Sequence, residues 1–178
     1  MKKVTIAISI SLIFCVSIVV AFLLCFPRKY EKLIDKYSTE FHLSKSLVAS
    51  VIDIESGYKA DALSRSGAVG LMQVLPSTAS DCAKRLKIDY EESDLYNVDT
   101  NIMIGCFYLR YLIDMFDGNI ENSLSAYNWG PKNVKDWIED GNVDGLGTIT
   151  NIPVEETRDY ISKFRVSNFV YKNIYKYD

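Results

Sequence analysis

Residues 67 to 79 read GAVGLMQVLPSTA, and a shorter stretch, IESGY at 54 to 58, precedes them. The longer stretch holds two glycines, an apolar run interrupted by the amide Gln73, and Pro76. Residues 67–70 predict a tight loop in which at least one residue takes a positive φ angle, and Pro76 suits the first turn of a helix. Gln73 is therefore a polar side chain in a run that otherwise has the composition of a core.

Apolar residues on both sides of this stretch recur with the period of an α-helix. This spacing predicts helices over residues 30–41, 44–55, 76–86, 101–116, 120–126 and 153–175. Strand-like alternation of any length is absent from the sequence. A chain of 178 residues, 48% of them hydrophobic, is long enough for one well-filled domain and too short for two ordinary ones. The sequence therefore predicts an all-α domain.

Residues with strong end preferences mark the boundaries of these helices. Ser44 is an expected N-cap, and Gly57 is expected to stop the same helix. Asp99 is the expected N-cap of the next long helix. The helix over 120–126 is expected to give way to a loop at 127–131, where a glycine and a proline follow each other.

The first part of the chain has the composition of a membrane anchor. Residues 4–26 carry no charge, two lysines precede them, and Arg28 and Lys29 follow. At roughly 1.5 Å per residue, this run is about 34 Å of helix, enough to cross a hydrocarbon core of about 30 Å. A cleaved signal peptide is an alternative, but the run exceeds the usual apolar length of about 7–15 residues. A lipoprotein is another, although Cys25 follows two leucines where a small residue is expected.

The short basic start favours a cytoplasmic N-terminus. The predicted organisation is therefore a cytoplasmic start and transmembrane signal-anchor over residues 1–28, followed by one extracytoplasmic domain over residues 29–178. This makes the chain a single-pass protein of the cell membrane.

The charged and sulfur-containing residues exclude several function classes. Lys and Arg number 20 against 23 Asp and Glu, and this acidic balance argues against binding nucleic acid. A catalytic triad of the usual kind or a multi-histidine metal site would rest on the single histidine, His42, which is expected in a loop before a helix. Cys82 and Cys106 form either one disulfide or two buried free thiols. Gly105 weakens its helix by roughly 1 kcal/mol against alanine, so close helix packing is expected there.

Glu55 stands at the C-terminal end of its predicted helix. The negative end of the helix dipole disfavours its charged form, and the apolar residues just before it favour desolvation. Both effects raise the pKa of Glu55. A carboxyl group that stays protonated near neutral pH can act as a general acid toward a leaving oxygen. Taken by itself, the position also fits a solvated glutamate at a helix end.

Four motifs in order along the chain resemble those of the soluble-type lytic transglycosylases, relatives of goose-type lysozyme. They are Glu55-Ser56, Ser64-x-x-Gly67-Ala68-x-Gly70-Leu71-Met72-Gln73, Ala126-Tyr127-Asn128-x-Gly130-Pro131 and Glu156-Thr157-Arg158-x-Tyr160. The intervening Asn101-Ile102-x-x-Gly105-x-x-Tyr108-Leu109 is also similar to that family. The similarity spans roughly residues 30 to 175.

The resemblance implies a lysozyme-like, mostly helical fold that cleaves the β-1,4 bond between N-acetylmuramic acid and N-acetylglucosamine in peptidoglycan. Glu55 is then the single acid/base, which protonates the glycosidic oxygen and later takes the proton of the C6 hydroxyl as that hydroxyl closes on C1. The product is a 1,6-anhydro sugar, and no water is consumed. Most glycosidases need two carboxylates, whereas here the substrate supplies its own nucleophile. The resemblance implies no metal or cofactor.

The same resemblance implies a set of substrate-binding residues, which are Ser56, Met72, Gln73, Tyr127, Asn128 and Tyr160. The two amides are expected in the cleft, and the two phenols are expected to hydrogen-bond near the glutamate or the sugar. Ser56 fits the family position that follows the acid. Met72 is expected to line the cleft, with core packing as the alternative.

Two other functions remain open at this stage. One is a hydrolytic muramidase of the goose-lysozyme kind, which adds water across the same bond. The other is an inactive glycan-binding module that positions envelope partners. The sequence leaves the physiological role open among wall turnover, sporulation, and secretion or conjugation.

Overall fold

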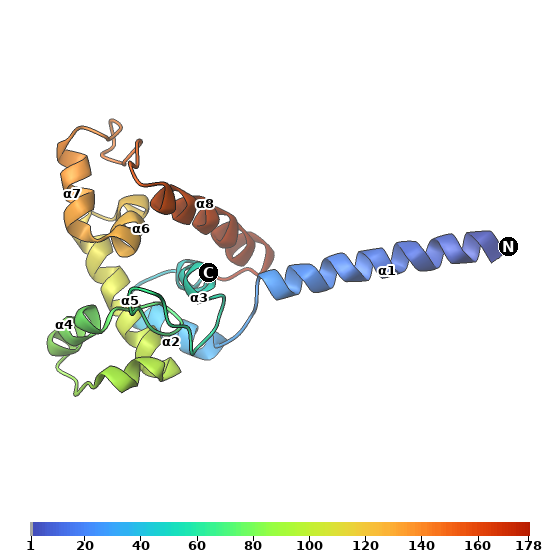
Figure 1. The fold of residues 1–178 in the computed structure, drawn as a ribbon, viewed down its shortest axis with the longest axis horizontal. Coiled ribbons are helices and arrows are strands. Elements are labelled where there is room, and N and C mark those ends of the chain that lie inside the picture. The colour runs from blue at the N-terminus through green and yellow to red at the C-terminus, as the bar shows by residue number, and fades with distance from the viewer. Residues whose placement is uncertain (1) are drawn as a thin grey trace.

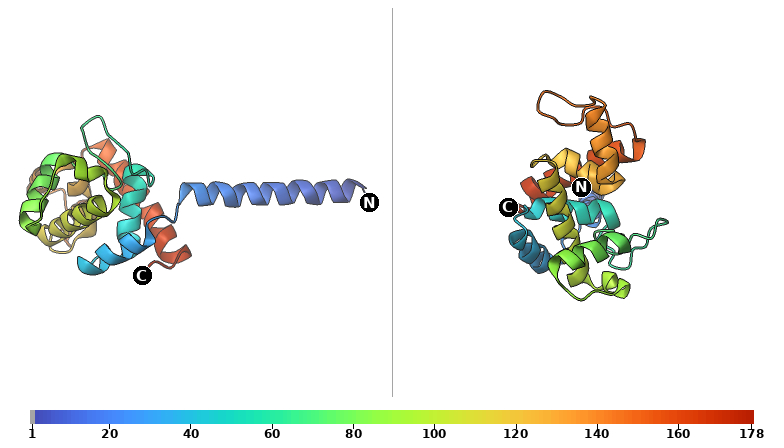
Figure 2. Two further views of the ribbon diagram at one scale, coloured as in Figure 1. Left: turned by 90° about the horizontal axis from the view of Figure 1, so that it is seen from below. Right: turned by 90° about the vertical axis from the view of Figure 1, so that its left-hand side faces the viewer.

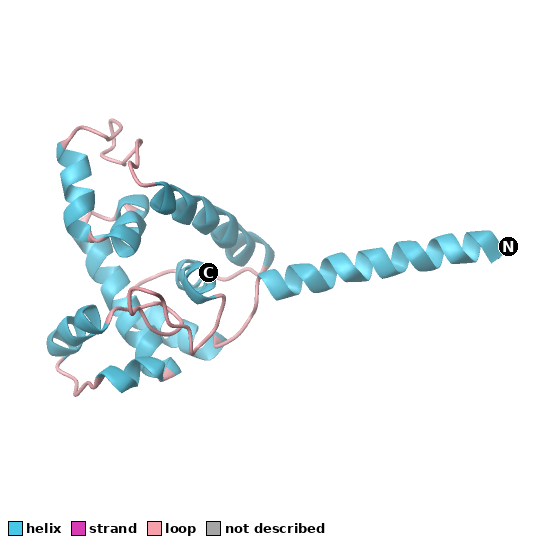
Figure 3. Cartoon of the chain, viewed as in Figure 1, coloured by secondary structure: helices cyan, strands magenta, loops and turns pink. Residues whose placement is uncertain are grey.

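The computed structural model describes the backbone of residues 2–178 and the side chains of residues 13–178. Its helices are α1 (Lys2–Cys25), α2 (Glu31–Glu40), α3 (Lys45–Ser56), α4 (Pro76–Leu86), the 3₁₀ helix η1 (Glu92–Tyr96), α5 (Val98–Met115), α6 (Ile120–Trp129), α7 (Pro131–Glu139), α8 (Glu155–Phe169) and the π-helical turn η2 (Val170–Ile174). Figure 3 shows these helices joined by loops. Strand-like pairing in the described residues is limited to isolated bridges, such as Val69 with Val74. The all-α prediction is confirmed.

Helix α5 runs through the middle of the domain. It packs against α2, α4, α6 and η1, while α3 packs against α2 and α8 (Figure 1). One apolar core joins these helices, and its fully buried members include Val48, Ile52, Leu71, Met72, Ile102, Leu109 and Leu124. A smaller core lies between α5, α6 and α7, around Leu112, Val134 and Trp137.

Helix α1 projects from the domain as a single straight rod (Figures 1 and 2). Its described side chains are mostly exposed and apolar, among them Phe14, Val19 and Leu24. Among the described residues no helix is long and apolar enough to cross a membrane. Residues 4–12 of the predicted anchor lie outside the part of the chain whose side chains are described.

The predicted ends of α3 are confirmed. The Ser44 hydroxyl accepts a hydrogen bond from the Leu47 N–H at 3.2 Å. Gly57 follows the helix with a φ of 58°, and its N–H donates to the Asp53 carbonyl. Glycine takes this left-handed conformation at little cost, which is why it ends helices.

Two other boundary predictions are wrong. Helix α5 is capped by Asn97, whose side-chain oxygen accepts hydrogen bonds from two backbone N–H groups of the first turn. Asp99 cannot serve as the cap because it lies inside that turn and its carboxylate accepts a hydrogen bond from Tyr37 of α2. The loop predicted at 127–131 is also wrong for its first three residues, which are helical. Helix α6 continues to Trp129, and the chain turns only at Gly130, which has a φ of 90°.

Gly105 and Asn101 bring α5 close to the loop at 67–75. A Cβ atom on Gly105 would lie 2.7 Å from the Cβ atom of Met72, so the close packing expected at Gly105 is present, but against this loop and not against another helix. The buried Asn101 side chain donates to the carbonyls of Val69 and Leu95, both at 2.9 Å, and accepts from the Met72 N–H at 2.8 Å. The bonds to Leu95 and Met72 satisfy backbone groups that would otherwise be buried without partners, and the Val69 carbonyl also accepts from the Val74 N–H.

Cys82 on α4 and Cys106 on α5 are both buried free thiols. Of the two alternatives that the sequence left open, a disulfide or two free thiols, the structure has the free thiols. Burial raises the pKa of the Cys82 thiol to about 11. Both side chains therefore act as small apolar groups in the core.

We expect Gly105→Ala to destabilise the domain. Forcing a methyl group against the Met72 Cβ atom costs about 1–3 kcal/mol, and the better helix propensity of alanine returns at most about 1 kcal/mol. The thermal unfolding temperature of the detergent-solubilised protein measures the loss. Gly145→Ala is the matched control, because a Cβ atom there meets open space. An equal effect of the two substitutions would contradict the packing argument.

Candidate active site

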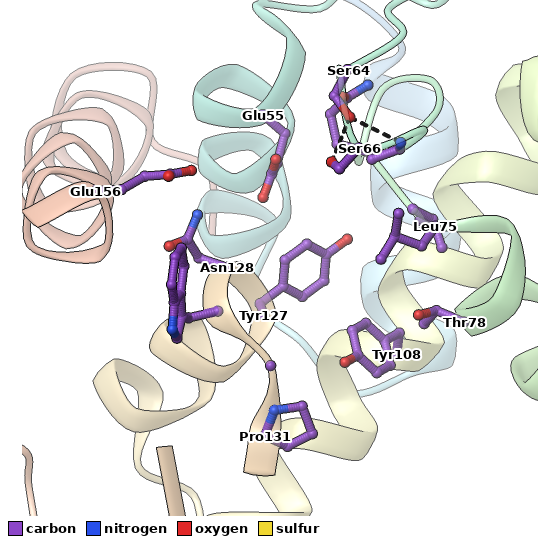
Figure 4. A pocket seen from close by; sticks show the side chains of 15 residues that line it. Glu55, Ser64, Ser66, Leu75, Thr78, Tyr108, Tyr127, Asn128, Pro131 and Glu156 are labelled. Atoms are coloured by element: carbon purple, nitrogen blue, oxygen red, sulfur yellow. Dashed lines mark hydrogen bonds between the residues drawn. The ribbon is translucent and has the colours of Figure 1, made fainter. Parts of the chain in front are cut away.

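A pocket of about 620 Å³ opens beside the end of α3. Helix α3 contributes Glu55, the loop before α4 contributes Gln73, α6 contributes Tyr127 and Asn128, and α8 contributes Glu156. Figure 4 shows several of these side chains converging on one space. The fold therefore gathers two carboxyl groups, two amides and a phenol from four separate segments of the chain.

The electrostatics of Glu55 fit a general acid. Its surroundings raise the pKa of Glu55 to about 7, chiefly through burial of the carboxyl group. The Tyr160 hydroxyl donates a hydrogen bond to Glu55 Oε1 at 2.7 Å, which lowers the pKa, and the negative charge of Glu156 raises it. A pKa near 7 keeps a large share of the carboxyl groups protonated at neutral pH.

Glu156 is a carboxyl group of the pocket that the sequence did not predict. It was part of a matched motif, but no role was assigned to it. Glu156 and Tyr160 are four residues apart on α8 and so lie on one face of that helix. Because Tyr160 was predicted to lie near Glu55, the same spacing could have placed Glu156 there as well.

Ser56 ties the loop at 67–75 to α3. Its hydroxyl lies 2.8 Å from the Leu71 carbonyl and 3.1 Å from the Ile52 carbonyl, and can donate to either one. Within the loop, Val69 and Val74 exchange backbone hydrogen bonds, and Gly67 and Gly70 have φ angles of 83° and 77°. The predicted positive φ angles are therefore confirmed, and Ser56 holds this loop next to Glu55.

Gln73 lines the pocket, and its side-chain amide is hydrogen-bonded to nearby backbone. Its Nε2 atom donates to the carbonyl of Ala62 at 3.1 Å and to that of Gly70 at 2.9 Å. An amide nitrogen has two protons, so both are used by the backbone. Only the Oε1 atom of Gln73 remains to meet a ligand, and it can do so only as an acceptor.

Tyr127 and Asn128 lie in the last turn of α6 and are fixed in the same manner. The Tyr127 hydroxyl donates to the Met72 carbonyl at 2.8 Å, and burial raises its pKa well above the usual value. Asn128 Oδ1 accepts from the Thr157 hydroxyl at 2.7 Å. The Asn128 Nδ2 group is thus the donor that this residue can offer to a ligand.

Met72 occupies the core, the alternative that the sequence left open. Its side chain is fully buried against Gly105 and does not line the pocket. It contributes to the site through its backbone, since its carbonyl holds Tyr127. Further lining residues are Ser64, Ser66, Thr78, Tyr108 and Trp129.

His42 lies in the turn after α2, as predicted, with a φ of 53°. It does not line the pocket. Among the described residues, no group of three or more His, Cys, Asp or Glu side chains is arranged to hold a metal ion.

Relatives of known name match most of the described domain. The chain is 34% identical over 157 residues to the soluble lytic murein transglycosylase of Salmonella typhimurium, covering 86% of this chain and 23% of that one. It is 28% identical over 170 residues to the membrane-bound lytic murein transglycosylase C of Actinobacillus pleuropneumoniae, covering 83% of this chain and 47% of that one. The chain thus spans about a quarter of the length of the first of these relatives.

Solved structures share the fold. The 70 kDa soluble lytic transglycosylase of Escherichia coli superposes with a TM-score of 0.78 at 31% identity, covering 84% of this chain and 25% of that one. An inactive mutant of the lytic transglycosylase Slt from Pseudomonas aeruginosa gives a TM-score of 0.77 at 28% identity, covering 85% and 25%. The lysozyme-like, all-helical fold is therefore confirmed. Since the family model of the transglycosylase SLT domain also matches residues 32–144, the chain belongs to the transglycosylase SLT domain family.

Proposed function

We propose that this chain is a membrane-anchored peptidoglycan lytic transglycosylase. It cleaves the bond between N-acetylmuramic acid and N-acetylglucosamine without water and leaves 1,6-anhydro ends. The observation that carries the proposal is Glu55, a carboxyl group whose pKa is raised to about 7 beside a pocket. The names of the relatives, which are lytic murein transglycosylases, support the same chemistry.

Glu55 serves the reaction twice. Its proton passes to the glycosidic oxygen as the bond from C1 to that oxygen breaks. The C6 hydroxyl of the muramoyl residue then attacks C1, and its proton returns to the Glu55 carboxylate. One acid/base group is sufficient because the nucleophile belongs to the substrate, and a pKa near the working pH suits both transfers.

The remaining pocket residues bind and orient the glycan. Asn128 Nδ2 donates to a hydroxyl or acetamido oxygen of the sugar, and Gln73 Oε1 accepts from a hydroxyl or acetamido N–H. Trp129, which lines the pocket and is 39% exposed, offers a ring face for stacking. Ser56 and Tyr127 serve by holding the loop at 67–75 in position, because their hydroxyl groups can donate to its carbonyls.

The N-terminal segment is proposed as the membrane anchor. Residues 4–26 form an uncharged run with basic residues on both sides, and a helix of that length matches the bilayer core. The exposed apolar side chains of the described half of α1, such as Val16 and Leu24, support this assignment.

A hydrolytic muramidase is the second candidate, and Glu156 favours it. This carboxyl group lines the pocket together with Glu55, and inverting glycosidases use a second carboxylate to activate water. The two reactions differ in their product, since hydrolysis adds one water to the muramoyl end.

The first prediction concerns the reaction itself. Full-length protein in detergent is expected to release anhydro-muropeptides from cell-wall sacculi, and Glu55→Gln is expected to lower the rate by about 10²- to 10⁴-fold because the proton donor is lost. Mass spectrometry of the products measures both. Products heavier by one water would replace the proposal with hydrolysis, and full activity of Glu55→Gln would overturn the role of Glu55.

The second prediction concerns pH. Because Glu55 must begin protonated, kcat/KM is expected to fall as the pH rises through about 7. Tyr160→Phe removes a hydrogen bond that favours the carboxylate, so the pKa of Glu55 rises and the alkaline limb moves to higher pH. Glu156→Gln removes a nearby negative charge, so the pKa falls and the limb moves to lower pH.

Opposite displacements of the two limbs are the expected signature. If Glu156 were instead the base that activates water, Glu156→Gln would abolish turnover rather than move the profile. Displacement in the same direction by both substitutions would contradict the assigned electrostatics.

The third prediction concerns the anchor. Val16→Arg places a charge near the middle of the apolar run at a cost of about 2.5–3.5 kcal/mol and is expected to shift the protein toward the fraction that alkaline carbonate extracts from membranes. Leu24→Arg is the matched control, since an arginine near the end of the run can extend to the interface. Complete extraction of the unaltered protein would refute anchoring.

A further inference from the structure

The junction between α1 and the domain is fixed by two tyrosines of the C-terminal segment. The Tyr175 hydroxyl donates to the Phe26 carbonyl at 3.0 Å, and the Tyr171 hydroxyl donates to the Pro27 carbonyl at 2.7 Å. The rings of Phe26 and Tyr171 also meet edge to face, with centroids 6.5 Å apart. The segment that leaves α1 is therefore held by side chains of the domain.

Exposed apolar side chains lie on the same C-terminal segment. Val166, Phe169 and Ile174 are 59%, 60% and 51% exposed. Val166 lines a cavity together with Phe26, which places it beside the junction. Figure 2 (left) shows the red end of α8 on the side of the domain from which α1 leaves. Phe169 lines a second cavity, together with Lys172 and Glu121. Exposed large apolar side chains that follow one another within a short segment mark a candidate interaction surface.

Basic side chains surround these three residues. Lys163, Lys172 and Lys176 are exposed on the same segment, and Lys163 lines the cavity that holds Val166. Lys163 and Lys176 form no ion pair among the described residues. Lys172 forms a long one, with its Nζ atom 3.8 Å from Asp178 Oδ2. Asp53, the acidic residue of that cavity, accepts a hydrogen bond from Ser167. The apolar side chains are thus bordered by a net positive charge.

We propose that this root face, made of Val166, Phe169 and Ile174 with Lys163, Lys172 and Lys176, rests on the anionic phospholipid surface of the membrane that α1 enters. The inference rests on the proposed anchoring. The apolar groups enter the boundary of the acyl chains while the lysines meet the headgroups, as in helices that lie on membranes. Tyr175, which is partly exposed at the junction, also suits the membrane–water interface.

Tethering makes this contact favourable although it is small. Three apolar side chains bind a free domain to lipid only weakly. Because α1 already holds the root face close to the bilayer, docking is an intramolecular step at high effective concentration. The contact therefore sets the orientation of the domain and is not needed to keep the protein in the membrane.

The test uses full-length protein in vesicles of phosphatidylglycerol and phosphatidylethanolamine, with and without brominated acyl chains. Phe169→Trp and, in a second variant, Val166→Trp introduce an indole at exposed positions of the root face. Brominated chains are expected to quench the added fluorescence of both variants after subtraction of the signal from Trp129 and Trp137. Tyr96→Trp is the control, since Tyr96 is also exposed and ends η1, which packs against α4 and α5.

Quenching in both root-face variants beyond that of the Tyr96→Trp control supports the proposal. Protein that stays with the vesicles in alkaline carbonate but shows no more quenching than the control overturns the proposed lipid contact of the root face. Protein that leaves the vesicles in carbonate refutes the anchor itself. The two failures are therefore distinguishable.

Discussion

The site depends on one buried amide. Asn101 bonds three backbone groups, the carbonyls of Val69 and Leu95 and the N–H of Met72. The Val69 carbonyl also accepts from the Val74 N–H, but the Leu95 carbonyl and the Met72 N–H would cost free energy if buried without a partner, so Asn101 stabilises the loop at 67–75 against α5. Gly105 permits the same approach because it has no side chain to separate α5 from Met72. Through the loop, these contacts also position the carbonyls that Ser56 and Tyr127 can bond.

Local patterns predicted the helices, because the period of apolar residues and the identity of Ser44 and Gly57 act within a few residues. Prediction was wrong where two local signals competed. Both Asn and Asp suit an N-cap, and in the structure Asn97 caps the helix while Asp99 accepts a hydrogen bond from Tyr37, 62 residues away. The hydrogen bond from the Tyr127 hydroxyl to the Met72 carbonyl, 55 residues away, could not be predicted from local sequence either. Glu55, Gln73, Tyr127 and Asn128 were predicted and line the pocket, whereas the place of Glu156 and the atoms that remain available to a ligand were not predicted.

Helix α8 controls the chemistry of a residue that belongs to α3. It places Tyr160 and Glu156 on one face, and their effects on the pKa of Glu55 are opposite in sign. Burial by the surrounding elements provides the largest effect, and these two neighbours adjust it. A small displacement of α8 would therefore change the balance between the protonated and charged forms of Glu55 without any change in the residues present. The packing of α3 on α8 is accordingly part of the proposed catalytic machinery.

The tyrosine bonds to the carbonyls of Phe26 and Pro27 also limit where the proposed enzyme can work. A domain on a long flexible linker can reach many positions above a membrane. A domain held at the base of its anchor can only diffuse in the membrane plane and rotate about the helix axis. Its cleft then stays at one height above the bilayer. Glycan strands in more distant layers of the wall would be out of reach, and only the layer at that height would be cut.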